Sequence, residues 1–116
     1  MVLREKSHIN LIIMMMKGLC MIVCELVSFY EQPSQELLKK HRNFLKNKGE
    51  EGKLLMAGRF FDGTGSLLIW KSDKLDEIKK IAMSDPYYLE GLTSFILKPW
   101  NLTWDFTENP PLQPEL

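Results

Sequence analysis

The sequence is poor in cysteine, with Cys20 and Cys24 as its only two thiols among 116 residues. In a strand, residues rise by about 3.3 Å each, so these two would lie about 13 Å apart, beyond the roughly 7 Å that a disulfide spans. Two cysteines without histidines at finger spacing also do not predict a zinc site. We therefore expect reduced thiols, no metal and a cytoplasmic location.

Long hydrophobic runs and an excess of one charge are also missing. The apolar runs 11–16 and 19–24 are short, with Lys17 and Gly18 between them, whereas a membrane span needs about 20 apolar residues. No small-residue cleavage site of a signal peptide is present. Fifteen basic and fifteen acidic residues cancel, so no overall field attracts nucleic acid or an anionic membrane. The sequence predicts neither partner.

Motifs for covalent or phosphate chemistry are absent as well. The run Gly63-Thr64-Gly65 lacks the Gly-Lys-Ser/Thr that completes a phosphate loop. No serine or cysteine lies in a recognisable nucleophile motif, and the two cysteines are interpreted as core thiols. We predict neither covalent catalysis nor a bound cofactor.

The chain does contain alternating strand and helix patterns. Apolar, β-branched and aromatic residues predict strands at 19–30, 53–61, 66–71 and 93 to about 104. The turn residues 62–65 join the second and third strands as a hairpin. Helices are predicted from Pro33 to Lys48, with a stop at Gly49, and from a cap at Ser72 or Asp73 to about Ser84, followed by a helical turn at 86–91.

This order, βαββαβ, predicts an α+β fold of the ferredoxin-like kind. Right-handed crossovers place both helices on one face of a four-stranded antiparallel sheet, and Pro99 suits an edge position for the last strand. The other sheet face also carries apolar side chains, so we expect a second copy to cover it in a homodimer. We expect an extension at 1–18, the domain at 19–104 and a proline-rich tail at 105–116.

Two titratable residues lie on the inward sides of the two predicted helices. His41 lies within the apolar stripe of Leu37, Leu38, Phe44 and Leu45, and Asp85 ends the stripe of Ile78, Ile81 and Ala82. Because burying such groups without a partner is costly, they are expected to meet each other or a ligand. Two alternatives stay open: a core histidine with a structural hydrogen bond, and an aspartate that only caps the turn beginning at Pro86.

Several blocks carry a resemblance to a known family: residues 40–45, 52–58, 65–70, 84–92 and 98–100. In these blocks the chain resembles the YCII-related (YciI-like) family over about residues 19–104. The resemblance implies a dimeric α+β barrel, and it implies that His41 and Asp85 are a catalytic pair. Arg59 is a departure, because the family often has proline at that position.

The chemistry of such a pair follows from its residue types. Imidazole exchanges protons near neutral pH, and a neighbouring carboxylate fixes its tautomer, so His41 would act as general acid or base with Asp85 orienting it. Arg59 is a candidate clamp for a carboxylate or phenolate, and Ser66 is a weaker candidate. Tyr88 is a candidate, with other aromatic residues, to line a pocket for a ring.

The function favoured at this point is a small cofactor-independent enzyme that transfers a proton or eliminates a group on a small cyclic or aromatic substrate. The resemblance implies it, since the family includes an enzyme that removes chloride from chlorinated hydroquinones. The alternative is a dimeric, non-catalytic module for a small ligand, because ACT-type domains share the βαββαβ order. An RNA-recognition domain is disfavoured, because Trp70 is the only aromatic residue in the third strand.

Overall fold

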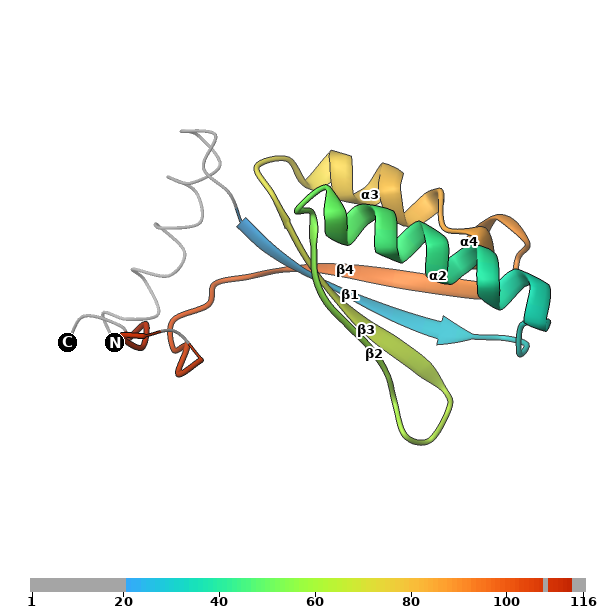
Figure 1. Ribbon diagram of the computed structural model, residues 1–116, viewed down its shortest axis with the longest axis horizontal. Helices are drawn as coiled ribbons and strands as arrows, with labels where there is room; N and C mark the ends of the chain where they lie inside the picture. Colours follow the sequence, from blue (N-terminus) through green and yellow to red (C-terminus); the bar gives the residue numbers. More distant parts are fainter. Residues whose placement is uncertain (1–20, 108, 114–116) are drawn as a thin grey trace.

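The computed structural model describes residues 21–107 and 109–113. Its elements are β1 Met21–Phe29, α2 Gln35–Glu50, β2 Leu54–Arg59, β3 Gly65–Ser72, α3 Leu75–Met83, α4 Pro86–Leu89 and β4 Thr93–Trp100. All strand pairs are antiparallel, in the order β2-β3-β1-β4, and the helices lie on one face of this sheet (Figure 1). The predicted ferredoxin-like α+β fold is confirmed, while the expected extension at 1–18 and Cys20 lie outside the described residues.

The core lies between the sheet and α3. Alternate residues of β1 point toward the helices, so Met21 and Val23 are buried while the residues between them are less so. Trp70 from β3 and Ile78 from α3 are fully buried beside them. This core fixes the sheet beneath α3, and it leaves α2 with no fully buried residue.

The ends of α2 differ from the sequence prediction at both sides. The helix begins at Gln35 because the side chain of Ser34 accepts a hydrogen bond from the backbone N–H of Leu37 and so serves as the N-cap, after Pro33. It continues through Gly49 to Glu50 and stops at Gly52, whose φ of 78° suits glycine. The backbone N–H of Lys53 closes the last turn by donating to the carbonyl of Lys48 at 3.0 Å.

The start of α3 also corrects a prediction. The N-cap residue is Lys74, which makes no side-chain cap, so neither Ser72 nor Asp73 has that role. The hydroxyl of Ser72 instead bonds the backbone of Lys74, accepting from its N–H at 3.0 Å. A side chain two residues from the helix is thus used in the turn that leads into it.

The last strand ends at Trp100, four residues earlier than the prediction. The segment beyond it runs away from the sheet (Figure 1), and its backbone pairs with itself through two hydrogen bonds of 2.8 Å between Asp105 and Leu112. The rings of Trp104 and Phe106 stack with centroids 5.7 Å apart. Within the described residues, no helix is long and apolar enough to cross a membrane.

The sheet face opposite the helices is apolar, and none of the described helices covers it. Leu26 of β1 lies between Leu67 of β3 and Ile96 of β4 in register, which makes a continuous apolar row. Ile96 is 61% exposed and Met56 is 64% exposed. We refer to this surface as the open sheet face.

Candidate functional site

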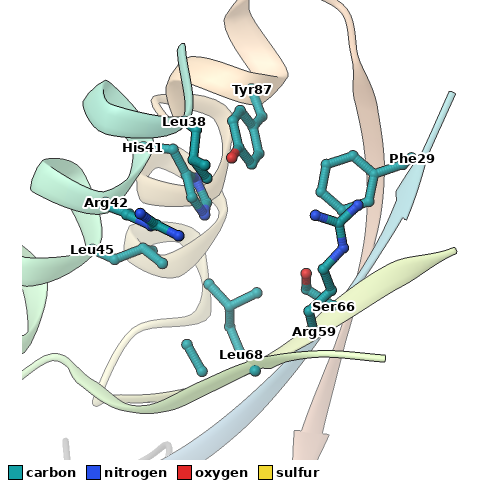
Figure 2. A pocket seen from close by; sticks show the side chains of 11 residues that line it. Phe29, Leu38, His41, Arg42, Leu45, Arg59, Ser66, Leu68 and Tyr87 are labelled. Atoms are coloured by element: carbon teal, nitrogen blue, oxygen red, sulfur yellow. The ribbon is translucent and has the colours of Figure 1, made fainter. Parts of the chain in front are cut away.

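A cavity of about 230 Å³ lies between α2 and the β2–β3 side of the sheet. Its walls come from α2, from the ends of β1 and β2, from β3 and from α4, and the lining residues are Phe29, Leu38, His41, Arg42, Leu45, Ala57, Gly58, Arg59, Ser66, Leu68 and Tyr87. Figure 2 shows His41 and Arg42 on the helix side of this space and Arg59 and Ser66 on the sheet side. Polar groups therefore converge on an otherwise apolar space, as in small-molecule sites.

His41 and Asp85 are in direct contact at the edge of this cavity. Nδ1 of His41 lies 2.9 Å from Oδ1 of Asp85, and only 15% and 10% of the two side chains are exposed. An ionised carboxylate can only accept a hydrogen bond, so Nδ1 of His41 carries the proton and donates it. The other ring nitrogen, Nε2, is then the acceptor of the neutral ring, and the ring lines the cavity (Figure 2). The structure thus brings together the two residues that the sequence placed on inward stripes.

Asp85 is also the N-cap of α4. The same Oδ1 atom accepts a hydrogen bond of 2.9 Å from the backbone N–H of Tyr87, and Pro86 occupies the first helical turn. The carboxylate of Asp85 therefore does both things that the sequence suggested: it caps α4, and it contacts His41. Because the cap anchors the carboxylate to the backbone, the orientation of the His41 ring is fixed by α4.

The ring of Tyr87 stacks on the imidazole of His41, with centroids 3.8 Å apart and planes 8° apart. Burial raises the pKa of Tyr87, and the negative charge of Asp85 raises this pKa further, whereas the nearby Arg59 and Arg42 lower it. The net shift is upward, so the phenol remains protonated at neutral pH. It is a hydrogen-bond donor at the wall of the cavity.

Arg59 reaches the cavity from the end of β2, where we predicted a clamp. Its guanidinium lies over the ring of Phe29, with Cζ 4.8 Å from the centroid, and it donates a hydrogen bond to the side-chain carbonyl of Gln32. Phe29 in turn contacts Tyr87 edge to face, with centroids 5.6 Å apart. The aromatic contact and the hydrogen bond together hold the guanidinium in one orientation.

The other two predicted binding residues have different outcomes. Ser66 lies opposite Arg59 in the β2–β3 register and lines the cavity. Tyr88 is not among the residues that line it, because its ring packs edge to face on Phe95 at 5.2 Å. The neighbouring Tyr87 occupies the position that we expected for Tyr88.

Arg42 also lines the cavity, although it lies among basic residues of α2 that are typical of a solvated helix face. A usable signal exists: Arg42 follows Leu38 by four residues and precedes Leu45 by three, and both leucines line the same wall. The many basic residues around it in α2 concealed this spacing.

A second buried carboxyl lies behind the site. Glu25 of β1 is only 3% exposed and accepts a hydrogen bond of 2.9 Å from the indole N–H of Trp70. Burial raises the pKa of Glu25 to about 7, the hydrogen bond from Trp70 opposes this shift, and the charge of Asp85 adds to it. The described residues contain no cluster of three or more His, Cys, Asp or Glu side chains suited to a metal ion.

The fold and the cavity together define a ferredoxin-like α+β protein with a histidine–aspartate contact at the edge of a cavity. Residues 16–101 match the model of the YCII-related domain, and the chain belongs to that family.

The chain is similar to a bacterial protein in sequence and to a solved enzyme structure in fold. The uncharacterized protein YjpA of Bacillus subtilis (strain 168) is 33% identical over 72 residues, which cover 62% of this chain and 85% of that protein. The 5-chloro-2-hydroxyhydroquinone dehydrochlorinase from Burkholderia phenoliruptrix, solved in complex with 2,5-dihydroxybenzoquinone, has a TM-score of 0.55 and 21% identity, with 69% of this chain and 93% of that chain covered. The second likeness shows a shared fold.

Proposed function

We propose that this protein is a small enzyme that uses His41 and Asp85 to transfer a proton, or to eliminate a group, on a small cyclic or aromatic substrate. The observation that carries the proposal is the 2.9 Å contact between Nδ1 of His41 and Asp85, together with the position of the ring on the cavity wall. The dehydrochlorinase of similar fold acts on a hydroquinone, which supports a ring as the substrate class. No cofactor is part of this proposal.

The proposed chemistry starts at Nε2 of His41. This atom accepts a proton from an acidic O–H or C–H bond of the substrate, and the positive charge that develops on the imidazole is stabilised by the carboxylate of Asp85. The electron pair left on the substrate then expels a leaving group, or the same proton returns at another atom of the ring. Tyr87 contributes a hydrogen-bond donor to a substrate oxygen during this step.

The proposed assembly is a homodimer joined through the open sheet face. This apolar surface includes Leu26, Leu67 and Ile96, and a chain of 116 residues buries a modest core when alone. A second copy of the same face would cover it in an isologous contact.

The test of the enzymatic proposal is a screen of the purified protein against hydroxylated and halogenated aromatic rings and small lactones. Product formation is followed by absorbance and by release of halide. We expect turnover of at least one compound by the wild-type protein and loss of that turnover in His41→Ala. Compounds that bind but are never converted would favour the alternative, a non-catalytic ligand-binding module.

A further inference from the structure

The lining of the cavity has a marked imbalance of charge. It includes two guanidinium groups, Arg42 and Arg59, and none of its lining residues is an aspartate or a glutamate. In the part of the chain that the structure describes, neither arginine is paired with a carboxylate. Two unpaired cations that share a small space repel each other, and a bound anion would relieve that repulsion.

The two arginines belong to opposite walls. Arg42 comes from α2 and Arg59 from the end of β2, and Figure 2 shows them on the two sides of the space. Both influence the phenol of Tyr87, whose pKa each of them lowers. The two positive charges therefore act on one common region, next to the ring that stacks on His41.

Arg59 is also held in place before any ligand binds. The ring of Phe29 lies under its guanidinium, and the side-chain carbonyl of Gln32 accepts one of its N–H groups. A guanidinium has five N–H donors, so most of them stay available. A guanidinium fixed in this way can donate two parallel hydrogen bonds to one carboxylate.

We propose that the natural ligand is a single ring that bears a carboxylate, with the carboxylate bound between Arg42 and Arg59 and the ring in the apolar part of the cavity, which Leu38, Leu45 and Leu68 line. This inference rests on the proposed function in that the far side of the ring would face Nε2 of His41. The cavity of about 230 Å³ is smaller than the roughly 300 to 1,000 Å³ of pockets for drug-sized ligands. One ring with a short acidic substituent is a ligand of suitable size.

The test compares two probes of nearly equal shape that differ in charge, para-hydroxybenzoate and para-hydroxybenzamide. Dissociation constants are measured by NMR titration of the isotope-labelled full chain at low salt. We expect the benzoate to bind at least about 10-fold more tightly than the benzamide, because only the benzoate places a negative charge and two acceptor oxygens between the arginines. Arg42→Gln and Arg59→Gln should each weaken benzoate binding about 10-fold while changing benzamide binding less than about 2-fold.

Lys39→Gln is the matched control, because it removes one positive charge from an exposed position on α2 that does not line the cavity. It should leave the affinity of both probes unchanged. Equal affinities of the two probes, an equal loss of both in the arginine variants, or the absence of shifts at cavity residues would overturn the proposal.

The binding measurement also separates this proposal from the enzymatic one. His41→Ala should keep the preference for benzoate, since His41 is not part of the clamp. A preserved preference without turnover of any compound would remove the catalytic proposal and leave the anion site. Turnover of neutral rings without a preference for benzoate would remove the anion site and leave the catalytic proposal.

Discussion

The imidazole of His41 lies flat against the phenol ring of Tyr87, with their centroids 3.8 Å apart. This stacking and the hydrogen bond to Asp85 restrain the imidazole in two directions, along its face and at Nδ1. The backbone N–H of Tyr87 is itself bonded to Asp85, so α4 supplies both restraints. Asp85 and Tyr87 thus orient one side chain of another helix, as expected where geometry must be held for chemistry.

The first prediction separates the two roles of Asp85. Asparagine is as good an N-cap as aspartate, so Asp85→Asn should retain the cap of α4 and lower the free energy of unfolding by less than about 1 kcal/mol. It removes the charge that stabilises protonated His41, so turnover should fall at least about 100-fold. Urea denaturation and steady-state kinetics measure the two effects.

Asp85→Ala is the companion variant. It removes the cap and leaves Nδ1 of His41 without its acceptor, so a loss of about 2 kcal/mol in the free energy of unfolding is expected. If Asp85→Asn kept full activity, Asp85 would be a structural cap and no more.

The second prediction concerns the close approach of β1 and β3 beside the site. A Cβ atom on Gly65 would lie 1.9 Å from the backbone carbonyl oxygen of Val27, so Gly65→Ala forces the two strands apart. We expect a loss of about 1 to 3 kcal/mol in the free energy of unfolding, measured by urea denaturation.

Gly49→Ala provides the control, since an added Cβ there would meet only the carbonyl oxygen of Leu54 at 3.9 Å. Within α2 this change should leave stability equal or slightly raised, because alanine favours helix over glycine. Equal effects of the two substitutions would mean that the strands adjust freely at Gly65.

The sheet and its topology could be predicted because their signals are local. Strand patterns repeat every two residues, and the turn residues 62–65 determine the hairpin. The helix ends were harder, since several residues compete to form them: α2 begins after the cap Ser34 and not at Pro33, and it stops at Gly52 and not at Gly49. The residue at which a helix begins or ends depends on the backbone conformation of the whole turn, which a single residue type does not determine.

For the site, the sequence predicted the direction in which side chains point better than it predicted which residues they contact. The inward stripes indicated that His41 and Asp85 point into one layer, but the 2.9 Å contact depends on how α2 and α4 pack. The choice between Tyr87 and Tyr88 was open for a similar reason. A helix of four residues is too short for a hydrophobic period that would show which face points inward. The cap at Asp85 instead sets the rotation of α4 about its axis.

The third prediction tests the open sheet face. Light scattering of the purified wild-type protein should give twice the mass of one chain. Ile96→Glu introduces a charge into the apolar row of this face and should weaken the dimer at least about 100-fold, because the interface would have to bury the charge without a partner. Circular dichroism should show that the monomer stays folded.

Met83→Glu serves as the control for the third prediction. It adds the same charge at an exposed hydrophobic residue, 41% accessible at the end of α3 on the helix side of the sheet. This variant should remain dimeric. A monomeric wild-type protein at micromolar concentration would rule out the proposed assembly.

The last prediction uses the buried carboxyl of Glu25, whose pKa rises to about 7 from its usual 4.5 because burial disfavours the charged form. Between these two values the folded protein holds a proton that the unfolded chain releases, so folding is favoured less and less as the pH rises through this window. The full contribution, about 3 kcal/mol, is lost above pH 7.

Glu25→Gln keeps an acceptor for the indole of Trp70 and cannot ionise. Its melting temperature, relative to that of the wild type, should therefore rise by several degrees between pH 5 and pH 8, whereas exposed Glu31→Gln, the control for net charge, should show no such trend. A constant difference between Glu25→Gln and wild type over this range would mean that Glu25 does not change its charge there, and that the negative potential behind Asp85 and His41 is the same at every pH at which the site is proposed to work.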